Sequence, residues 1–383
     1  MKKINFCLLG PMNSQNPSAI TQEDLTPYQD SISYLGESSD VRPFIAKSYC
    51  VVLPSYKEGI PRTLLEAMSM QKPIITTNVS GCKECIQPPF SHQDHLIIGQ
   101  NGILIPPKNP NALTQAISYL SNLSQEKYLE MANASREYAK NRFDITHTLS
   151  MYLQALQRNG IKNKILAFIS NSCFGMYNFR LPILQALQKN GYQIHIIAPK
   201  DDRFFYLLQK EDFILHSLSI DSKGTNPRSD FQTYLSIKQI LKTIQPDLVF
   251  NYTIKPVIYG SLACNQLKIP NIAITTGLGY VFIEGNLKKK ILKNFVCMLY
   301  KIALKKTNEV WFLNQDDQME FLKNKIITSS QAKILDGEGV DTQFFAPQDN
   351  PPPPLSQTFI LIARMLKDKG VFEFIQASRN FNQ

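Results

Sequence analysis

Unbroken apolar runs alternate with stretches of helical periodicity along almost the whole chain. The runs predict strands at Ile4–Leu9, Cys50–Leu53, Pro73–Asn78, Gly102–Ile105, Lys164–Ser170, Gln193–Ala198, Leu248–Asn251, Asn271–Thr275, Val310–Asn314, Lys333–Leu335 and Thr358–Ile362. The periodic stretches predict helices at Ile60–Met70, Pro110–Asn122, Gln125–Phe143, Thr146–Gln157, Phe179–Asn190 and Gly370–Phe381. Such alternation is typical of α/β units with parallel sheets.

The pattern also predicts where the domains divide. A polar break at 158–163 is followed by a strand, the small and polar segment Asn171–Gly175, a helix and a second strand, which is how an α/β domain begins. The run Pro351–Pro354 is typical of a semi-rigid polyproline linker. We therefore expect domain segments at 1–158, 164–346 and 358–383, with a Pro-rich linker at 347–357.

Composition sets limits on the class of protein. A chain of 383 residues that is 43% apolar and 19% charged has room for two globular domains. Its seven cysteines are odd in number and dispersed, which indicates reduced thiols in a cytoplasmic protein. Cys82 and Cys85 form a lone C-x-x-C, a poor zinc site without a second pair. The first apolar run is too short for a signal peptide, and no stretch is long enough to span a membrane.

The most informative local feature is a pair of glutamates eight residues apart. Glu58 lies in a Gly-Pro turn after an apolar strand, and Glu66 lies inside the helix that Pro61 can open. A carboxylate accepts two hydrogen bonds from a vicinal diol, and a helix start offers free N–H groups to phosphate. Glu66 stands among leucine, alanine and methionine, where a carboxylate needs a partner. The pair therefore suits a nucleotide sugar better than a solvated helix face.

A basic loop follows the last predicted strand. Arg364 and Lys369 are five residues apart, directly after Thr358–Ile362. Two cations at the carboxyl end of a strand would neutralise a departing diphosphate, as a metal ion does in other enzymes. Alone, the loop would more simply be a solvated surface segment. Together with the glutamate pair, it favours a phosphate site.

These motifs resemble those of the family 4 retaining glycosyltransferases. In that family the glutamate pair lies late in the second of two Rossmann-like domains, and an Arg-x4-Lys loop lies near that domain's start. Here the order differs: residues 164–383 resemble the first domain plus the opening of the second, and residues 3–158 resemble the remainder of the second. The resemblance implies an α/β, GT-B fold, with two parallel-sheet domains facing across a cleft and a permuted chain order. A circular permutation, a fusion of two partial genes and an assembly error would each produce this order.

The resemblance implies metal-independent, retaining transfer of a sugar from a nucleotide-sugar substrate, with no cofactor. Arg364, Lys369 and Glu58 would be the catalytic residues. Glu66 would bind ribose, the backbone of Gly59 and Ile60 would bind sugar or phosphate, and Glu84 would line the nucleotide side. The sequence contains no separate general base, so the leaving phosphate would accept the proton of the acceptor.

Two residues of the other predicted domain complete the candidate site. Gly175, in the loop after the strand at Lys164–Ser170, would cover the donor phosphates, although the family's double glycine is missing. Lys255 follows the strand at Leu248–Asn251 and would pair with a phosphate of the donor or of a lipid-linked acceptor, unless it is an ordinary surface lysine.

The expected partners follow from the same resemblance. The donor would be a UDP-hexose or UDP-N-acetylhexosamine, and the acceptor a lipid-linked glycan in surface polysaccharide or glycoprotein assembly. The basic helix Lys288–Lys306 combines lysines with an apolar stripe. It would either contact the cytoplasmic face of a membrane or simply pack on its own sheet.

Two other functions are compatible with parts of the sequence. An inactive fusion of two transferase remnants, acting at most as a binding protein, would contain the same motifs without a working site. The net charge of +10 also allows nucleic-acid binding, but no basic motif interleaved with aromatic residues supports it.

Overall fold

The computed structural model describes residues 3–12, 16–161, 164–221, 224, 226–278, 282, 287–348 and 356–382. The chain divides into two compact units. One, called here the split domain, consists of residues 1–147 and 339–383; the other, the contiguous domain, consists of residues 148–338. All seven cysteines are free thiols. None of the helices in the described ranges is long and apolar enough to cross a membrane.

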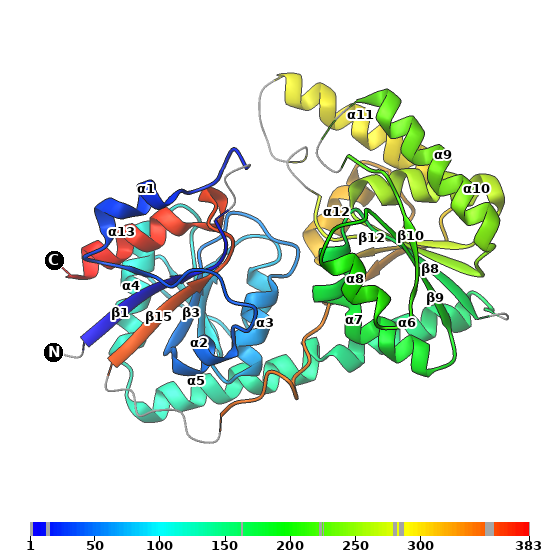
Figure 1. Cartoon of the computed structure of the whole chain (residues 1–383). Helices are drawn as coiled ribbons and strands as arrows, with labels where there is room; N and C mark the ends of the chain where they lie inside the picture. The colour runs from blue at the N-terminus through cyan, green and yellow to red at the C-terminus, as the bar shows by residue number, and fades with distance from the viewer. Residues whose placement is uncertain are drawn as a thin grey trace. The chain divides into compact units, whose positions relative to one another are not determined.

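The split domain is built on one mainly parallel sheet (Figure 1). Its strands, in spatial order, are β2 (Ser33–Tyr34), β1 (Lys3–Leu9), β15 (Ser356–Ile362), β3 (Cys50–Leu53), β4 (Ile74–Thr77), β7 (Gly102–Ile105), β6 (Leu96–Ile98) and β5 (Ser91–Gln93). The last strand of the chain, β15, therefore lies between β1 and β3. It pairs with the whole of β1, from Lys3 opposite Ser356 to Leu9 opposite Ile362.

Helices cover both faces of this sheet. They are α1 (Gln22–Leu25), α2 (Arg42–Lys47), α3 (Arg62–Ser69), α4 (Pro110–Ser121), α5 (Gln125–Tyr138), the first part of α6 (Ile145–Arg158) and α13 (Val371–Asn382). Alternate residues of β15 point to opposite faces: Phe359 and Leu361 pack with α4 and α13, whereas Ile360 and Ile362 pack with α2 and α3. A central strand buried on both faces must be apolar throughout, which explains its sequence.

The end of the chain packs against its beginning within this domain. Phe6 of β1 has its ring centroid 5.7 Å from that of Phe374 and 6.2 Å from that of Phe381, both on α13. Phe6 also stacks on Phe359 of β15, at 6.1 Å. The two ends of the chain therefore share one hydrophobic core.

The contiguous domain has a second, fully parallel sheet. Its strands, in spatial order, are β10 (Ile214–Ser217), β9 (Gln193–Ala198), β8 (Ile165–Ile169), β11 (Leu248–Tyr252), β12 (Asn271–Thr275), β13 (Glu309–Phe312) and β14 (Ala332–Ile334). Its helices are α7 (Cys173–Lys189), α8 (Phe204–Gln209), α9 (Pro227–Ile244), α10 (Ser261–Leu267), α11 (Leu287–Leu304) and α12 (Gln315–Lys323). Tyr152 of α6 packs on Phe250 and Trp311 of this sheet, with ring centroids 5.0 Å apart in both cases.

The two sheets share one strand order. Counted along the chain from β8, the contiguous domain has the order 3-2-1-4-5-6-7. The split domain has the order 3-2-1-4-5-6 for its six parallel strands when β15 is counted first, before β1. This is the order of the doubly wound nucleotide-binding fold, which binds its ligands at the carboxyl ends of the central strands.

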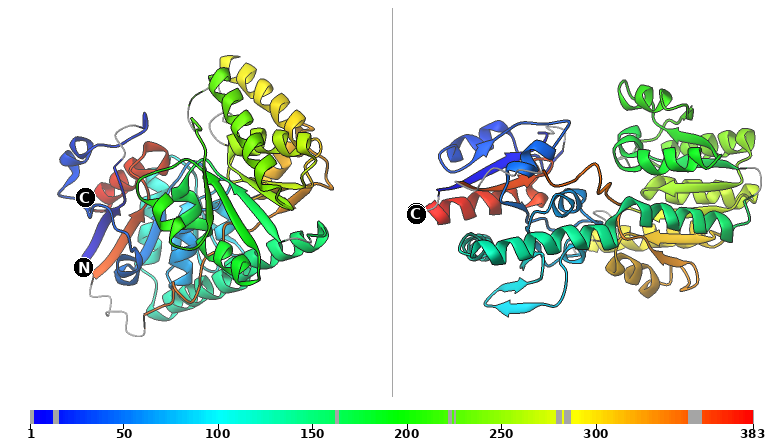
Figure 2. Two further views of the ribbon diagram at one scale, coloured as in Figure 1. Left: turned by 45° about the vertical axis from the view of Figure 1, so that its right-hand side comes forward. Right: turned by 90° about the horizontal axis from the view of Figure 1, so that it is seen from below.

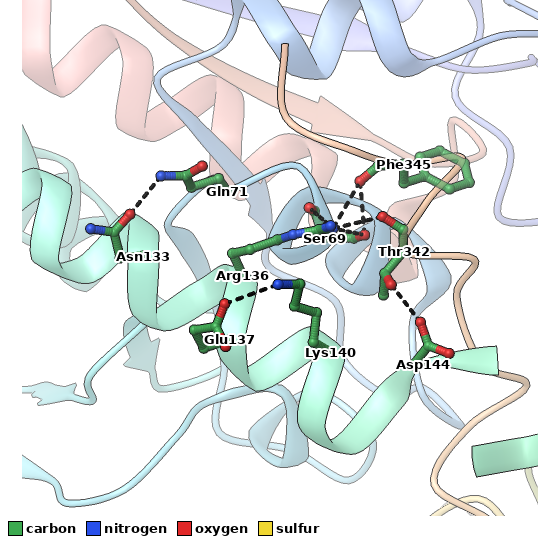
Figure 3. Close-up of polar contacts among 9 residues, drawn as sticks. All are labelled: Ser69, Gln71, Asn133, Arg136, Glu137, Lys140, Asp144, Thr342 and Phe345. Atoms are coloured by element: carbon green, nitrogen blue, oxygen red, sulfur yellow. Dashed lines mark hydrogen bonds and ion pairs between the residues drawn. The ribbon is translucent and has the colours of Figure 1, made fainter. Parts of the chain in front are cut away.

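The segment that returns from the contiguous to the split domain is held by polar contacts (Figure 3). Nη1 of Arg136, on α5, donates to the carbonyls of Ser69, Thr342 and Phe345 at 2.6, 2.8 and 3.4 Å. The Thr342 hydroxyl donates to the carboxylate of Asp144. These contacts connect the returning segment to α3 and to the residues just before α6.

The predicted strands are confirmed to within about two residues at each end, whereas two other expectations differ from the structure. The helix expected to begin at Phe179 begins at Cys173, because Ser172 is its N-cap and accepts a hydrogen bond from the amide of Gly175. The domain division falls at 147/148 and 338/339 rather than at 158 and 346, because Val340 pairs with Asp144 in the split domain. Strands β2, β5, β6 and β10 were not predicted, and neither were helices α1, α2, α8, α9, α10 and α12. Most of the Pro-rich linker lies outside the described residues.

Candidate functional site

Three loops meet at the carboxyl edge of the split domain's sheet. They follow β15, β3 and β4, and hydrogen bonds join them to one another. The amide of Tyr56 donates to the carbonyl of Asp368 at 2.9 Å, and the amide of Glu58 donates to the carbonyl of Ser80 at 3.2 Å. The hydroxyl of Thr63, in the first turn of α3, donates to the carbonyl of Ile362 at 3.1 Å. The predicted motifs are thus brought together, although some 300 residues separate them in sequence.

Two glycines permit this close approach. Gly81 has a φ of +82°, and a Cβ added there would lie 2.2 Å from the carbonyl oxygen of Gly59. Gly370 has a φ of +73°, and its added Cβ would lie 2.1 Å from the carbonyl oxygen of Pro54. Any larger residue would force the loops apart, because both contacts are with backbone atoms.

Glu58 and Lys369 form an ion pair across two of these loops. The Nζ of Lys369 lies 2.5 Å from Oε1 of Glu58, and their side chains are 13% and 16% exposed. Both side chains of this ion pair are therefore largely buried at the carboxyl edge of the sheet, and a small part of each remains accessible to solvent. Two of the three predicted catalytic residues therefore touch.

Arg364, the third predicted catalytic residue, lies two residues beyond the end of β15. Its side chain is exposed, and the structure gives it no ion pair or side-chain hydrogen bond with any described residue. An arginine side chain that extends from an ordered loop and has no acidic partner among the described residues is suited to bind an anion such as a diphosphate.

Glu66 projects from α3, and its side chain is 13% exposed. Its Oε1 lies 3.2 Å from Nε of Arg62, one turn earlier on the same helix. Burial raises the pKa of Glu66 to about 7, although the positive charge of Arg62 opposes the shift. Burying a carboxyl group in this way costs free energy, and carboxyl groups with such a raised pKa are typical of functional sites.

The other residues predicted for this side of the site have mainly structural contacts. The carboxylate of Glu84 accepts a hydrogen bond from the amide of Gly81 at 2.7 Å, and so holds the turn after β4. Gly59 presents its carbonyl to Gly81. Ile60 is half-buried against the core that α3 covers.

Gly175 and Lys255 lie in the contiguous domain. Gly175 is buried in the first turn of α7, and its carbonyl accepts a hydrogen bond from Nη1 of Arg180 at 2.8 Å. Lys255 follows β11, and its Nζ lies 2.5 Å from the carboxylate of Asp230 on α9. Tyr259 donates to the same carboxylate at 2.9 Å. Lys255 is thus already neutralised, which the sequence did not indicate.

Sequence reasoning also missed a buried charged cluster in the contiguous domain. Nη2 of Arg180 lies 2.5 Å from Oε1 of Glu338, and the two side chains are 5% and 13% exposed. The guanidinium lies over the ring of Tyr252, 4.2 Å from its centroid, and the Tyr252 hydroxyl contacts that of Tyr152 at 2.5 Å. The signal in the sequence was Arg180 itself, because an arginine on the buried face of a predicted helix needs a polar or acidic partner.

Two family models match the chain, each on a different domain. Residues 1–122 match the model described as Glycosyl transferases group 1, and residues 164–314 match the model described as Glycosyl transferase 4-like. The first lies within the split domain and the second within the contiguous domain.

Among curated proteins, the chain is 24% identical over 227 residues to the N,N'-diacetylbacillosaminyl-diphospho-undecaprenol alpha-1,3-N-acetylgalactosaminyltransferase of Campylobacter jejuni. That match covers 56% of this chain and 59% of the relative. It is also 30% identical to an uncharacterized glycosyltransferase of Haemophilus influenzae, over 28% of each chain. The chain thus spans less than two thirds of the length of these relatives.

Among solved structures, similarity was found to Acinetobacter baumannii MurG and to S. aureus MnaA in its UDP co-structure. The first is 15% identical and covers 45% of each chain, with a TM-score of 0.32. The second is 13% identical and covers 50% of this chain and 48% of that chain, with a TM-score of 0.35.

Proposed function

We propose that this chain, both domains of which match glycosyltransferase family models, is a retaining glycosyltransferase of the family 4 type with a GT-B fold. It would transfer a hexose or N-acetylhexosamine from a UDP-sugar to a lipid-linked or glycan acceptor. The observation that carries the proposal is the ion pair of Glu58 with Lys369 at the carboxyl edge of one sheet, with the exposed Arg364 in the same loop as Lys369. The matches to transferase families on both domains support it.

In the proposed reaction the donor diphosphate binds beside Arg364 and Lys369. Lys369 is held by Glu58 before the donor arrives, so it needs little reorganisation on binding. The bond between the anomeric carbon and the diphosphate breaks, and its electron pair leaves with the phosphate oxygen. The acceptor hydroxyl attacks from the same face and loses its proton to that oxygen. Arg364 and Lys369 would stabilise the departing charge without a metal ion or cofactor.

Glu66 would accept hydrogen bonds from the two ribose hydroxyls. Only the ionised carboxylate accepts both, so the raised pKa of Glu66 couples nucleotide binding to pH. At pH 8 the group is ionised before binding, whereas at pH 6 the first contact requires loss of a proton. The affinity for UDP should therefore fall as the pH is lowered below about 7.

The acceptor side of the proposal rests on the relatives. The name of the Campylobacter jejuni relative describes a transferase acting on a diphospho-undecaprenol. We extend that acceptor class to this chain, in surface polysaccharide or glycoprotein biosynthesis on the cytoplasmic side of the membrane. The contiguous domain would contact the acceptor, and α11, with its lysines and exposed apolar residues, would contact the membrane.

The strand order supports a permuted chain. Counting β15 first gives the split domain the order of the contiguous domain, and the end of α13 packs beside β1. A break in a loop between that helix and that strand is of the kind that domains tolerate. We propose that residues 356–382 correspond to the start of this domain in relatives with ordinary order.

The test is a UDP-release assay with a panel of UDP-hexoses and UDP-N-acetylhexosamines in EDTA. A synthetic polyprenyl-diphosphate monosaccharide serves as acceptor, and NMR assigns the anomer formed. Turnover of a UDP-sugar with a retained anomer is expected, and loss of turnover in Arg364→Ala. An inverted product or an absolute need for a divalent metal would contradict the mechanism. A folded protein that turns over no donor would favour the inactive fusion.

A further inference from the structure

A large apolar cavity lies among the helices of the contiguous domain, and its lining includes the ion pair of Lys255 with Asp230 described above. We call it the α9–α11 groove. Its floor is the turn Pro256–Gly260 with α10, and its walls are α9 and α11, which lie near each other in Figures 1 and 2. Its volume is about 830 Å³, enough for a sizeable small-molecule ligand. Its lining includes Phe231, Tyr234, Leu262, Phe295, Leu299 and Ile302.

Both walls expose large apolar side chains. Phe231 on α9 is 60% exposed, and Phe295 and Ile302 on α11 are 53% and 54% exposed. Ile291 and Met298 of α11 are similarly exposed, although they do not line the groove. A cluster of this kind along a groove marks an interaction surface, whereas single exposed apolar residues are common.

The course of the groove follows from the connections of its helices. Lining residues Ile254 and Leu278 come just after β11 and β12, at the carboxyl edge of the sheet. Lining residues Lys305 and Lys306 come just before β13, at the opposite edge. The groove therefore extends from the edge where α/β domains bind ligands to a basic outer end. An elongated apolar channel of this kind fits a hydrocarbon chain.

The charge of the groove selects among occupants. Helix α11 contains no acidic residue. The charged residues that line the groove are Lys305 and Lys306, together with Lys255 and Asp230, which pair with each other. A symmetric contact between two copies would bring these lysines toward their equivalents, which is unfavourable. Anionic amphiphiles, in contrast, place their hydrocarbon among the apolar residues and their phosphates beside lysines.

We infer that the α9–α11 groove binds the polyprenyl chain of a lipid-linked acceptor. The polyprenyl chain enters the groove from the bilayer at the end where Lys305 and Lys306 lie. The diphosphate attached to it lies at the other end of the groove, near Ile254 and Lys255. The ion pair of Lys255 with Asp230 then lies beside the head group and opens to it. The inference rests on the proposed function for the identity of the lipid, whereas the groove, its apolar walls and its charge are features of the structure.

The test is calorimetric binding of farnesyl diphosphate below its critical micelle concentration, with inorganic diphosphate as the reference. The double variant Phe231→Ser/Ile302→Ser removes apolar contacts from both walls at exposed positions, so folding should be retained. We expect it to bind farnesyl diphosphate at least about tenfold more weakly than wild type. Met319→Ser is the matched control, because Met319 is 63% exposed on α12, outside the groove. It should bind as wild type does.

Three results would overturn the inference. Equal affinity for farnesyl diphosphate and inorganic diphosphate would show that the groove does not recognise the hydrocarbon chain. Binding to equimolar phosphatidylglycerol–phosphatidylcholine vesicles, together with no binding of farnesyl diphosphate, would show contact with the bilayer alone. A wild-type dimer that dissociates in the double variant would show that a second copy occupies the groove. Binding of UDP is measured separately, so a failure of the transferase proposal would leave the lipid result distinct.

Discussion

The two domains have the same strand order but reach it along different paths in the chain. In the contiguous domain, each central strand is supplied by neighbouring sequence. In the split domain, β15 comes from the far end of the chain and inserts between β1 and β3. Burial on both faces and a full register with β1 determine its position. Strand chemistry, and not the order of strands along the chain, therefore specifies this sheet.

The contiguous domain is a long insertion between the two parts of the split domain, but it costs less closure entropy than its length suggests. The amide of Val340 donates to the carbonyl of Phe143 at 2.8 Å, and the amide of Ile145 donates to the carbonyl of Val340 at 3.0 Å. The outgoing and returning segments are thus adjacent. Since closure entropy grows only with the logarithm of loop length, a folded insertion with adjacent ends adds little to it.

The first prediction tests whether β15 is as important to its sheet as a central strand of the contiguous domain. Phe359 of β15 and Phe250 of β11 are both fully buried in central strands. Phe359→Ala and Phe250→Ala should each lower the free energy of unfolding by about 3–5 kcal/mol, because each leaves a large cavity. Urea denaturation measures both. A loss below about 1 kcal/mol for Phe359→Ala alone would mean that β15 is a peripheral addition to the sheet.

The second prediction concerns Glu66 in the split domain. Its folded-state pKa, about 7, lies above its ordinary value of 4.5, so the folded state binds more protons between these values. Stability should therefore fall as the pH rises from about 4.5 to 7. Glu66→Gln should raise the free energy of unfolding at pH 8 by up to about 3 kcal/mol while weakening UDP binding. Thermal unfolding at pH 5 and pH 8 measures the gain, and an equal gain at both values would exclude this cause.

The third prediction gives the contiguous domain the opposite pH dependence. Nδ1 of His195 lies 2.9 Å from Nε2 of His216, and His195 is 8% exposed. Burial, followed by the charge of His216, lowers the pKa of His195 to about 4. The unfolded state then binds more protons between about pH 4 and 6.5, so stability should fall as the pH drops through that range, by about 2 kcal/mol.

His195→Leu should flatten that acid-side slope, and the slope caused by Glu66 should remain. Chemical denaturation at half-unit pH intervals, followed by probes placed in each domain, separates the two contributions. An unchanged acid slope in His195→Leu would assign the effect to other groups.

The fourth and smallest effect concerns helix caps. The Ser172 side chain caps α7 in the contiguous domain, and the Asn109 side chain caps α4 in the split domain by accepting from the amide of Ala112 at 2.9 Å. Ser172→Ala and Asn109→Ala should each cost about 1 kcal/mol. Differential scanning calorimetry measures both. A cost near zero for Ser172→Ala would mean that the first turn of α7 is frayed and that the loop predicted there is the better description.

Much of the fold could be predicted from sequence because the central strands are continuous apolar runs. The runs at Cys50–Leu53, Gly102–Ile105 and Asn271–Thr275 match the observed strands residue for residue. The start of α7 could not be predicted in this way, because small and polar residues at a capped helix start resemble a loop. The ordinary alternation of strand and helix also gave no reason to pair β15 with β1.

The candidate site was predicted only as far as its motifs extend. Glu58 and Lys369 were placed together by resemblance, and the structure brings them into contact. The partners of Lys255 and Arg180 were missed, since ion pairs between distant residues leave no periodic signal. Glu66 illustrates the same limit: its apolar neighbours indicated burial, but its contact with Arg62 required the structure.

The most direct test of the account is calorimetric binding of UDP to wild type, Glu66→Ala, Arg364→Ala and the double variant, with GDP and ADP as controls. Glu66 comes from the first part of the split domain and Arg364 from the last. If the two ends of the chain build one nucleotide site, wild type binds UDP near the micromolar range, about −8 kcal/mol, and each single variant loses most of that affinity. If the folded wild type binds no nucleotide, or if Arg364→Ala binds UDP as wild type does, the two ends do not form one donor site and the account is wrong.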